Sequence, residues 1–278
     1  MNEPHDDSRP RIAVAIPCFN EAAAIAAVIA EWRAALPEAE VVAFDNNSTD
    51  GTGAIARGLG VRVVEVPERG KGHAVRASFA ALADRDAVIL VDGDGTYPAS
   101  QARALLAPIL DGSADMAIGA RRPVSEAGAM TPVRGLGNLL IHAAFFLLIG
   151  RGPGDLLSGY RAFNRRFREA VVPRSRGFEI ESELASEAVA HRLRTVEVPV
   201  PYRPRIAGSS SKLQAFGDGL RIVAMILQQS LRLRPWRPVA LLVGAAGALA
   251  LAIGPLTPLC AMLLGLAALV VIRATGGR

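Results

Sequence analysis

The chain has 278 residues, of which 51% are hydrophobic and only 5% aromatic, so it can form one substantial α/β domain with a smaller appendage. Its formal net charge of +5 suits an anionic membrane surface or a phosphorylated substrate. Nucleic acid is excluded as a partner, because its binding surfaces interleave basic with aromatic residues and this chain is poor in aromatics. Cys18 and Cys260 lie far apart and indicate neither a disulfide framework nor a zinc site.

The polar N-terminal tail, residues 1–10, has neither the basic start nor the apolar stretch of a secretory signal, so we expect the domain that follows to lie in the cytosol. From residue 11 onward, unbroken apolar runs alternate with apolar residues at helical spacing. Unbroken runs indicate strands covered on both faces, and therefore an α/β domain with a mostly parallel sheet over residues 11–212. The expected strands span residues 11–17, 41–45, 61–67, 87–92 and 115–120.

Two carboxylates, Asp92 and Asp94, follow the fourth expected strand in the sequence DGDGTYP. Ligands of parallel sheets bind beyond the carboxyl ends of the strands, and the two intervening glycines allow a close approach of the backbone. Carboxylate oxygens suit Mg²⁺ or Mn²⁺ held together with substrate phosphates. A solvated turn rich in Asp and Gly would give the same letters, so this pattern alone leaves both interpretations open.

Further polar clusters follow the neighbouring strands. The sequence FDNNSTDGT ends a strand at Asp45, where a carboxylate can accept hydrogen bonds from a ribose or base, while Ser48 or Asp50 can cap the next helix. The sequence ERGKGHAVR sets Arg69 and Lys71 at the start of a helix, where backbone N–H groups favour anions. Neither a Walker A loop nor a GxGxxG motif occurs, so P-loop and dinucleotide-dehydrogenase interpretations lose their support.

Three segments of the second half are candidates for membrane contact. Residues 138–150 are apolar but too short to cross a bilayer, and are expected either as a core helix or as an interfacial one. Residues 213–237 predict an amphipathic juxtamembrane helix whose arginines suit anionic headgroups, although packing on the domain would explain it too. Residues 238–272 are uncharged and interrupted in the middle by Gly and Pro, which predicts a transmembrane hairpin of two short helices. A re-entrant hairpin or a single tilted helix is the alternative. Arginines flank both ends of this run, which favours cytoplasmic termini.

Seven features occur along residues 11–212 and the tail in one order: AIPCFNE, FDNNSTDGT, RGKGHA, DGDGTYP, GAR, DLLSGYRAF and the hydrophobic hairpin. In this order they resemble family 2 glycosyltransferases of the dolichyl-phosphate mannose and polyprenyl-phosphate glucose synthase type. The resemblance implies a GT-A nucleotide-diphospho-sugar transferase fold, anchored in the cell membrane with its catalytic domain on the cytoplasmic side. It also implies transfer of a hexose or N-acetylhexosamine from a UDP- or GDP-sugar to polyprenyl phosphate, with inversion.

The same resemblance implies roles for individual residues. The donor-site residues would be Pro17, Phe19 and Glu21 at the base, Asp45 at the nucleoside, Lys71, Asp92 at the nucleotide, and Asp94 at a Mg²⁺ or Mn²⁺ ion. The residues that neutralise the donor diphosphate or the acceptor phosphate would be Arg121, Arg122, Arg205 and Lys212, with Arg161 and Arg203 nearby. Of these, Asp92, Asp94 and Arg121 would be catalytic. Mannose-phosphate synthases often have Tyr where Phe19 stands and Gln where Thr96 stands, which points towards UDP-sugars instead.

An ionised phosphate acceptor needs no general base, so the protein's task would be to position two anions. Asp155 would orient a loop near the sugar, whereas the acidic run from Glu179 to Glu183 either begins an exposed helix or contacts substrate. Two rival interpretations are transfer to a hydroxyl of a glycan and a catalytically silent membrane scaffold. The sequence QQSLRL lacks the Gln-x-x-Arg-Trp of polymer synthases, and intact acidic motifs argue against the scaffold. An oligomer remains possible.

Overall fold

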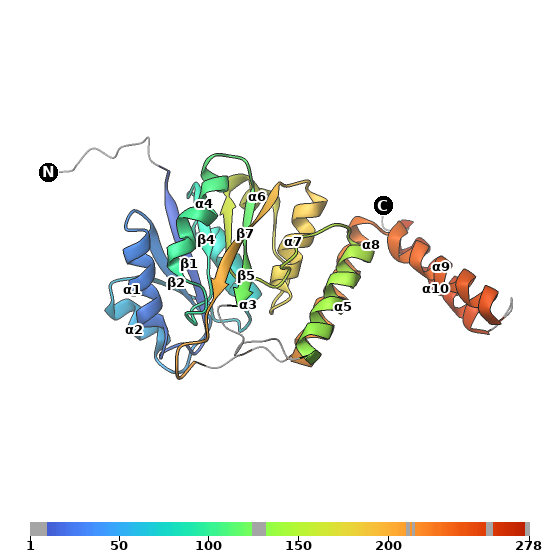
Figure 1. Ribbon diagram of the computed structural model, residues 1–278, viewed down its shortest axis with the longest axis horizontal. Coiled ribbons are helices and arrows are strands. Elements are labelled where there is room, and N and C mark those ends of the chain that lie inside the picture. Colours follow the sequence, from blue (N-terminus) through green and yellow to red (C-terminus); the bar gives the residue numbers. More distant parts are fainter. Residues whose placement is uncertain (1–9, 124–131, 210–211, 213–214, 254–257, 276–278) are drawn as a thin grey trace.

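The computed structural model describes residues 10–123, 132–209, 212, 215–253 and 258–275 (Figure 1). Within them, seven strands form one sheet in the order β3-β2-β1-β4-β6-β5-β7. Every pairing is parallel except those of β6, which runs antiparallel to β4 and β5. This confirms the mostly parallel α/β sheet. The strands are β1 (Ile12–Cys18), β2 (Glu40–Asp45), β3 (Arg62–Glu65), β4 (Ala87–Leu90), β5 (Met116–Pro123), β6 (Arg161–Asn164) and β7 (Thr195–Tyr202).

Helices cover both faces of the sheet, as the unbroken apolar strands require. On one face, alternate residues of β1 pack with Trp32 of α1 and Leu105 of α4. On the other face, β2 contributes Phe44 to a core shared with Phe79 of α3 and Leu184 of α7. The helices of these two layers are α1 (Ile25–Ala35), α2 (Thr52–Gly58), a 3-10 turn (Ala99–Gln101), α4 (Ala102–Leu110), α3 (Lys71–Ala81), α6 (Arg165–Ala170) and α7 (Ile180–Ala190).

A second group of helices extends from one end of the sheet (Figure 1). It consists of α5 (Pro132–Leu148), α8 (Ala215–Leu233), α9 (Trp236–Ile253) and α10 (Pro258–Thr275). Phe145 of α5 and Ile226 of α8 are buried in one cluster. The opposite side of α5 is exposed and apolar, with Leu139 64% and Phe146 61% accessible to solvent. The segment 138–150 is therefore neither wholly a core helix nor wholly a surface one.

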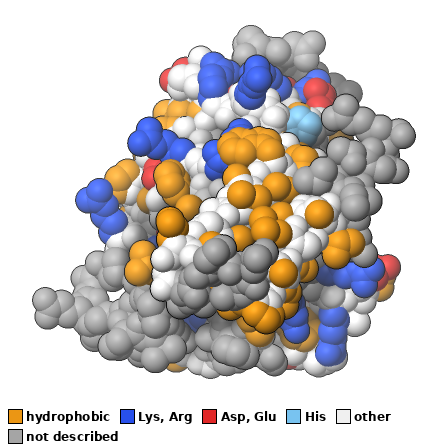
Figure 2. Space-filling view, turned by 90° about the vertical axis from the view of Figure 1, so that its right-hand side faces the viewer, with side chains coloured by type: hydrophobic (Ala, Val, Ile, Leu, Met, Phe, Trp, Pro, Cys, Tyr) orange, Lys and Arg blue, Asp and Glu red, His pale blue; other side chains and the backbone are white. Residues whose placement is uncertain are grey.

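The exposed apolar side chains gather at this end of the molecule, bordered by Lys and Arg (Figure 2). α9 and α10 pack against each other, and the Cys260 thiol lies 3.5 Å from the Ala246 carbonyl oxygen across their contact. By length and composition, no single helix among the described residues qualifies as a bilayer span. The segments 217–233 and 236–252 qualify only together, as a pair bent by 109°.

Asp115 directly precedes β5 and binds side chains and backbone of the neighbouring segments. Its buried carboxylate accepts hydrogen bonds from the Arg194 backbone N–H at 2.8 Å and from Asn164 Nδ2 at 2.9 Å, and pairs with Arg166 at 3.4 Å. Burial alone would raise the pKa of Asp115, but the hydrogen bonds from Arg194 lower it to about 2.

We expect Asp115→Ala to lower the free energy of unfolding by about 1–3 kcal/mol, because the Arg194 backbone N–H and Asn164 Nδ2 lose their buried acceptor, whereas the exposed side chains of Arg194 and Arg166 stay solvated. In the unsubstituted chain this contribution should be complete above the ordinary Asp pKa and be lost as pH falls towards about 2. Denaturant unfolding at several pH values measures both effects. The exposed Asp111→Ala serves as control, and equal losses in the two variants would contradict the assignment.

Candidate active site

The carboxyl ends of β1, β2 and β4 lie side by side, so the loops that follow them meet at one edge of the sheet. Backbone-to-side-chain hydrogen bonds tie the first two loops together. The Asn20 N–H donates to Ser48 Oγ at 3.0 Å, and the Ala22 N–H donates to Asp50 at 2.9 Å. Ser48 and Asp50 thus fix the loop after β1, and only Asp50 also contacts the start of α2, where it accepts the Thr52 N–H at 3.0 Å; the N-cap position itself is Gly51. Capping alone does not describe their contacts.

Asp94 is 3% exposed and fully engaged. Its Oδ1 accepts hydrogen bonds from Thr96, at 3.0 Å from the backbone N–H and 2.7 Å from the hydroxyl. Its Oδ2 pairs with Arg205 at 2.6 Å. Arg205 belongs to the segment that follows β7, whose residue Arg203 also donates its backbone N–H to the Thr96 carbonyl. The sequence places these residues far apart, and the fold joins them.

Asp92 faces a buried cation. Lys71 Nζ lies between Asp92 Oδ1 and Glu181 Oε1, at 2.5 Å from the latter. Burial alone would lower the pKa of Lys71, but Asp92 and then Glu181 raise it well above its ordinary value. Gly159, in the SGYR sequence, lies so near that a Cβ there would stand 2.4 Å from Asp92 Oδ2. A side chain at this position would therefore displace the carboxylate.

Glu21 lies beneath the same segment that carries Arg205. Its Oε2 accepts a hydrogen bond from Ser209 Oγ at 2.5 Å, and Lys212 Nζ lies 3.5 Å from its Oε1. Burial raises the pKa of Glu21. The predicted diphosphate or acceptor residues Arg205 and Lys212 are thus brought to the predicted donor residues Asp94 and Glu21, and each is paired with a carboxylate.

The remaining donor-site candidates line the β1 and β2 ends. Pro17 is buried within β1, and the half-buried Phe19 ring lies 5.1 Å from the Arg69 guanidinium. Asp45 is buried and accepts a hydrogen bond from the Ser48 N–H at 3.0 Å. A Cβ at Gly53 would stand 2.3 Å from Asp45 Oδ2, so glycine is required beside this carboxylate.

Arg121 and Asp155 form a bidentate pair, with Nε and Nη2 at 2.8 and 2.7 Å from the carboxylate oxygens. The Arg121 guanidinium also lies over the Tyr202 ring, 5.5 Å from its centre. Burial alone would raise the pKa of Asp155, but the hydrogen bonds and charge of Arg121 hold it below its ordinary value. An ionised carboxylate held this way orients its arginine rather than accepting a proton. Arg122, by contrast, is exposed.

Two expectations from the sequence need correction. Arg161 is fully buried and donates to the Ser158 and Leu156 carbonyl oxygens at 3.0 and 2.8 Å, so it holds a loop instead of offering charge to a substrate. The acidic run does not begin an exposed helix, because Glu181 and Glu183 are only 4% and 2% exposed. Glu181 therefore joins the candidate site through Lys71. The acidic run hinted at such a role, but only the fold identifies the partner.

The carboxylates of Asp92 and Asp94 fit a divalent cation whose coordination is completed by substrate oxygens. Asp92 and Asp94 each hold a side-chain cation, so this edge attracts positive charge, and carboxylate oxygens are the ligands that Mg²⁺ and Mn²⁺ prefer. Within the described ranges, no group of three or more His, Cys, Asp and Glu side chains is arranged for a metal ion. Further ligands would therefore have to come from substrate oxygens or from other protein groups.

Comparisons with known proteins agree with this geometry. The family model described as Glycosyl transferase family 2 matches residues 13–170. The glycosyltransferase AglJ of Haloferax volcanii is 39% identical over 208 residues, which cover 75% of this chain and 68% of that protein. The dolichyl-phosphate hexose transferase of the same organism is 33% identical over 227 residues, 80% of this chain and 96% of that protein.

Among solved structures, glucosyl-3-phosphoglycerate synthase from Mycobacterium tuberculosis, in complex with phosphoglyceric acid, superposes with a TM-score of 0.66 at 26% identity and covers 80% of each chain. That enzyme has also been solved with Mn²⁺ and uridine-diphosphate-glucose, and this structure superposes with a TM-score of 0.64 at 24% identity. The likeness confirms a GT-A-like fold. The family match extends over more than half of the chain, and the chain is therefore a glycosyltransferase that belongs to family 2.

Proposed function

We propose that this enzyme transfers a hexose or N-acetylhexosamine from a nucleotide-diphosphate sugar to polyprenyl phosphate at a membrane. The observation that carries the proposal is the pairing of Asp92 with Lys71 and of Asp94 with Arg205 at the carboxyl edge of the sheet. Paired carboxylates and cations suit a diphosphate held with a divalent ion. The name of the dolichyl-phosphate hexose transferase, a relative over most of both chains, supports a lipid phosphate as acceptor.

The donor nucleotide would occupy the ends of β1 and β2. Asp45 would accept hydrogen bonds from the nucleoside, while Pro17, Phe19 and Glu21 would line the base pocket. Threonine stands at position 96, where it donates two hydrogen bonds to Asp94. We propose a UDP-sugar as the donor, because the DGDGTYP motif has Thr96 where mannose-phosphate synthases often have Gln.

The reaction would be a single inverting displacement. An ionised oxygen of the acceptor phosphate forms a bond to the anomeric carbon, while the bond from that carbon to the donor diphosphate breaks and the nucleoside diphosphate leaves with the electron pair. Asp92 and Asp94 would hold the divalent cation, which supplies positive charge to the departing diphosphate. Arg121, held by Asp155, would add a second positive charge for the departing diphosphate.

Membrane attachment is the second part of the proposal. Its support is the apolar outer side of α5, the apolar helices α9 and α10, and arginines at the α8–α9 junction. Trp236 at this junction is 62% exposed, as expected of an interfacial anchor. We expect the full chain to stay in the membrane fraction after alkaline carbonate extraction; complete release would contradict an integral hairpin spanning 238–272.

The test of the transfer reaction is a radiolabel assay on membranes that contain the full chain. UDP-glucose, UDP-N-acetylglucosamine and GDP-mannose are offered separately with polyprenyl phosphate and Mg²⁺ or Mn²⁺. We expect an acid-labile lipid product from one donor. Polyprenol and 3-phosphoglycerate serve as acceptors that lack the phosphate or the lipid. Transfer to either control at the rate of polyprenyl phosphate would overturn the acceptor assignment.

A further inference from the structure

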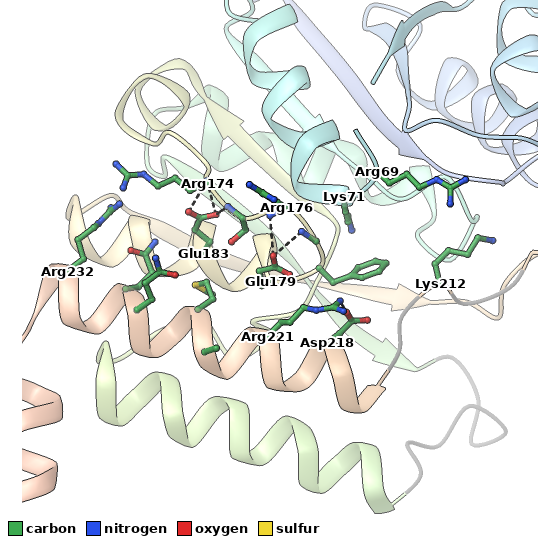
Figure 3. A pocket seen from close by; sticks show the side chains of 18 residues that line it. Arg69, Lys71, Arg174, Arg176, Glu179, Glu183, Lys212, Asp218, Arg221 and Arg232 are labelled. Atoms are coloured by element: carbon green, nitrogen blue, oxygen red, sulfur yellow. Dashed lines mark hydrogen bonds and ion pairs between the residues drawn. The ribbon is translucent and has the colours of Figure 1, made fainter. Parts of the chain in front are cut away.

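A groove of about 740 Å³ lies between α8 and the loop that precedes α7 (Figure 3). One wall consists of residues 174–179 and the amino end of α3, and the other wall consists of α8. Lys71 lines the groove at one end, next to Asp92, and Arg232 lines it at the end of α8 that leads into α9. The groove thus connects the active site with the apolar helices.

Two acidic side chains of the groove, Glu183 and Glu179, bind the backbone of the loop, while the buried Glu179 Oε2 has no hydrogen-bond partner among the described residues. Glu183 accepts the backbone N–H of Arg174 at 3.0 Å, and Glu179 accepts the backbone N–H of Arg176 at 3.1 Å. These carboxylates therefore fix the loop rather than neutralise its side chains. Within the described part of the chain, the exposed guanidinium groups of Arg174 and Arg176 form no ion pair, and the Arg69 guanidinium lies over the Phe19 ring.

Other cations near the active site are engaged. Arg205 pairs with Asp94, Lys212 with Glu21, and Lys71 with Asp92. A cation that already neutralises an internal carboxylate has less charge to offer a ligand, whereas an arginine without a carboxylate partner can form charge-assisted hydrogen bonds with a phosphate. The loop between Arg174 and Arg176 is therefore better suited to an incoming anion.

The α8 wall is mostly polar, with Asp218, Arg221, Gln228, Gln229 and Arg232, and its apolar part consists of Ala224 and Met225 between them. A ligand that suits both walls carries a phosphate and a hydrocarbon chain. We propose that this groove binds the acceptor lipid phosphate, with Arg174 and Arg176 holding its phosphate group before it reaches Lys71 and Asp92. This rests on the proposed function and adds an acceptor site that the family motifs do not contain.

The experiment compares two charge-matched double variants of the full chain. Arg174→Gln/Arg176→Gln alters the groove, and Arg62→Gln/Arg103→Gln removes two exposed arginines from β3 and α4. We expect the groove variant to raise the KM for polyprenyl phosphate about tenfold or more, because the phosphate loses its charge-assisted hydrogen bonds to both arginines. The KM for the nucleotide sugar should stay unchanged, as should both constants of the control.

An unchanged KM for polyprenyl phosphate, or an equal change in both variants, would overturn the proposal. So would a defect that occurs in anionic phospholipid vesicles but disappears in neutral detergent, because the groove would then bind bulk headgroups. A binding assay without nucleotide sugar compares polyprenyl phosphate with polyprenol. Because no transfer occurs in this assay, it tests the groove independently of the transfer reaction. Absence of transfer by the unsubstituted enzyme would end the proposed function, whereas arginine-dependent binding would still support the groove.

Discussion

Asp94→Asn should lower kcat for sugar transfer about 100-fold or more while leaving the fold intact. Asparagine keeps the shape and the Thr96 contacts of the aspartate but removes the charge that a divalent cation requires. Loss of one charge-stabilising group at a transition state typically costs this much. The measurement is transfer rate against Mn²⁺ concentration, together with Mn²⁺-dependent binding of the nucleoside diphosphate by calorimetry.

A purely structural role for Asp94 would arise from its pair with Arg205, and Arg205→Gln is the matching control. This variant breaks the same pair but leaves the carboxylate, so it should retain Mn²⁺-dependent nucleotide binding. If Asp94→Asn binds the nucleotide with an unchanged Mn²⁺ dependence, the metal assignment is wrong. If both variants lose the same activity and both keep metal-dependent binding, Asp94 only anchors the segment that carries Arg205.

The sequence predicted the part of the sheet whose strands are continuously apolar. β1, β2 and β4 are buried on both faces, so their apolar runs are unbroken and their neighbours follow from the alternation with helices. The same reasoning did not predict β6 or β7. β6 is four residues long and contains the buried Arg161, while β7 is largely exposed at the edge of the sheet and includes two prolines.

The candidate site divides in a similar way. Asp45, Asp92 and Asp94 could be predicted because each lies at or just beyond the end of a strand, at the edge where parallel sheets bind ligands. Two long-range pairings could not be predicted, because Arg205 reaches Asp94 from the segment after β7 and Glu181 reaches Lys71 from α7 through the tertiary fold alone. Sequence patterns report local structure, whereas ion pairs between distant segments depend on how the layers pack.

Lys71→Met should abolish transfer and also lower the free energy of unfolding by about 3–5 kcal/mol, since it leaves the buried Glu181 without its cation beside Asp92. Burial raises the pKa of Glu181 even in the intact pair. Without Lys71, folding should favour the protonated acid still more. The loss of stability should therefore be smallest at low pH and grow as pH rises through the pKa of Glu181 in the folded state.

The double variant Lys71→Met/Glu181→Gln separates the two roles of the lysine. Removing the unpaired carboxylate should restore most of the lost stability, because no buried charge remains without a partner. Transfer should stay lost, since Asp92 still lacks the cation that faces it. Denaturant unfolding and the transfer assay, applied to both variants, measure the two effects independently. Recovery of transfer together with stability would mean that Lys71 only neutralises Glu181 and takes no part in binding the donor.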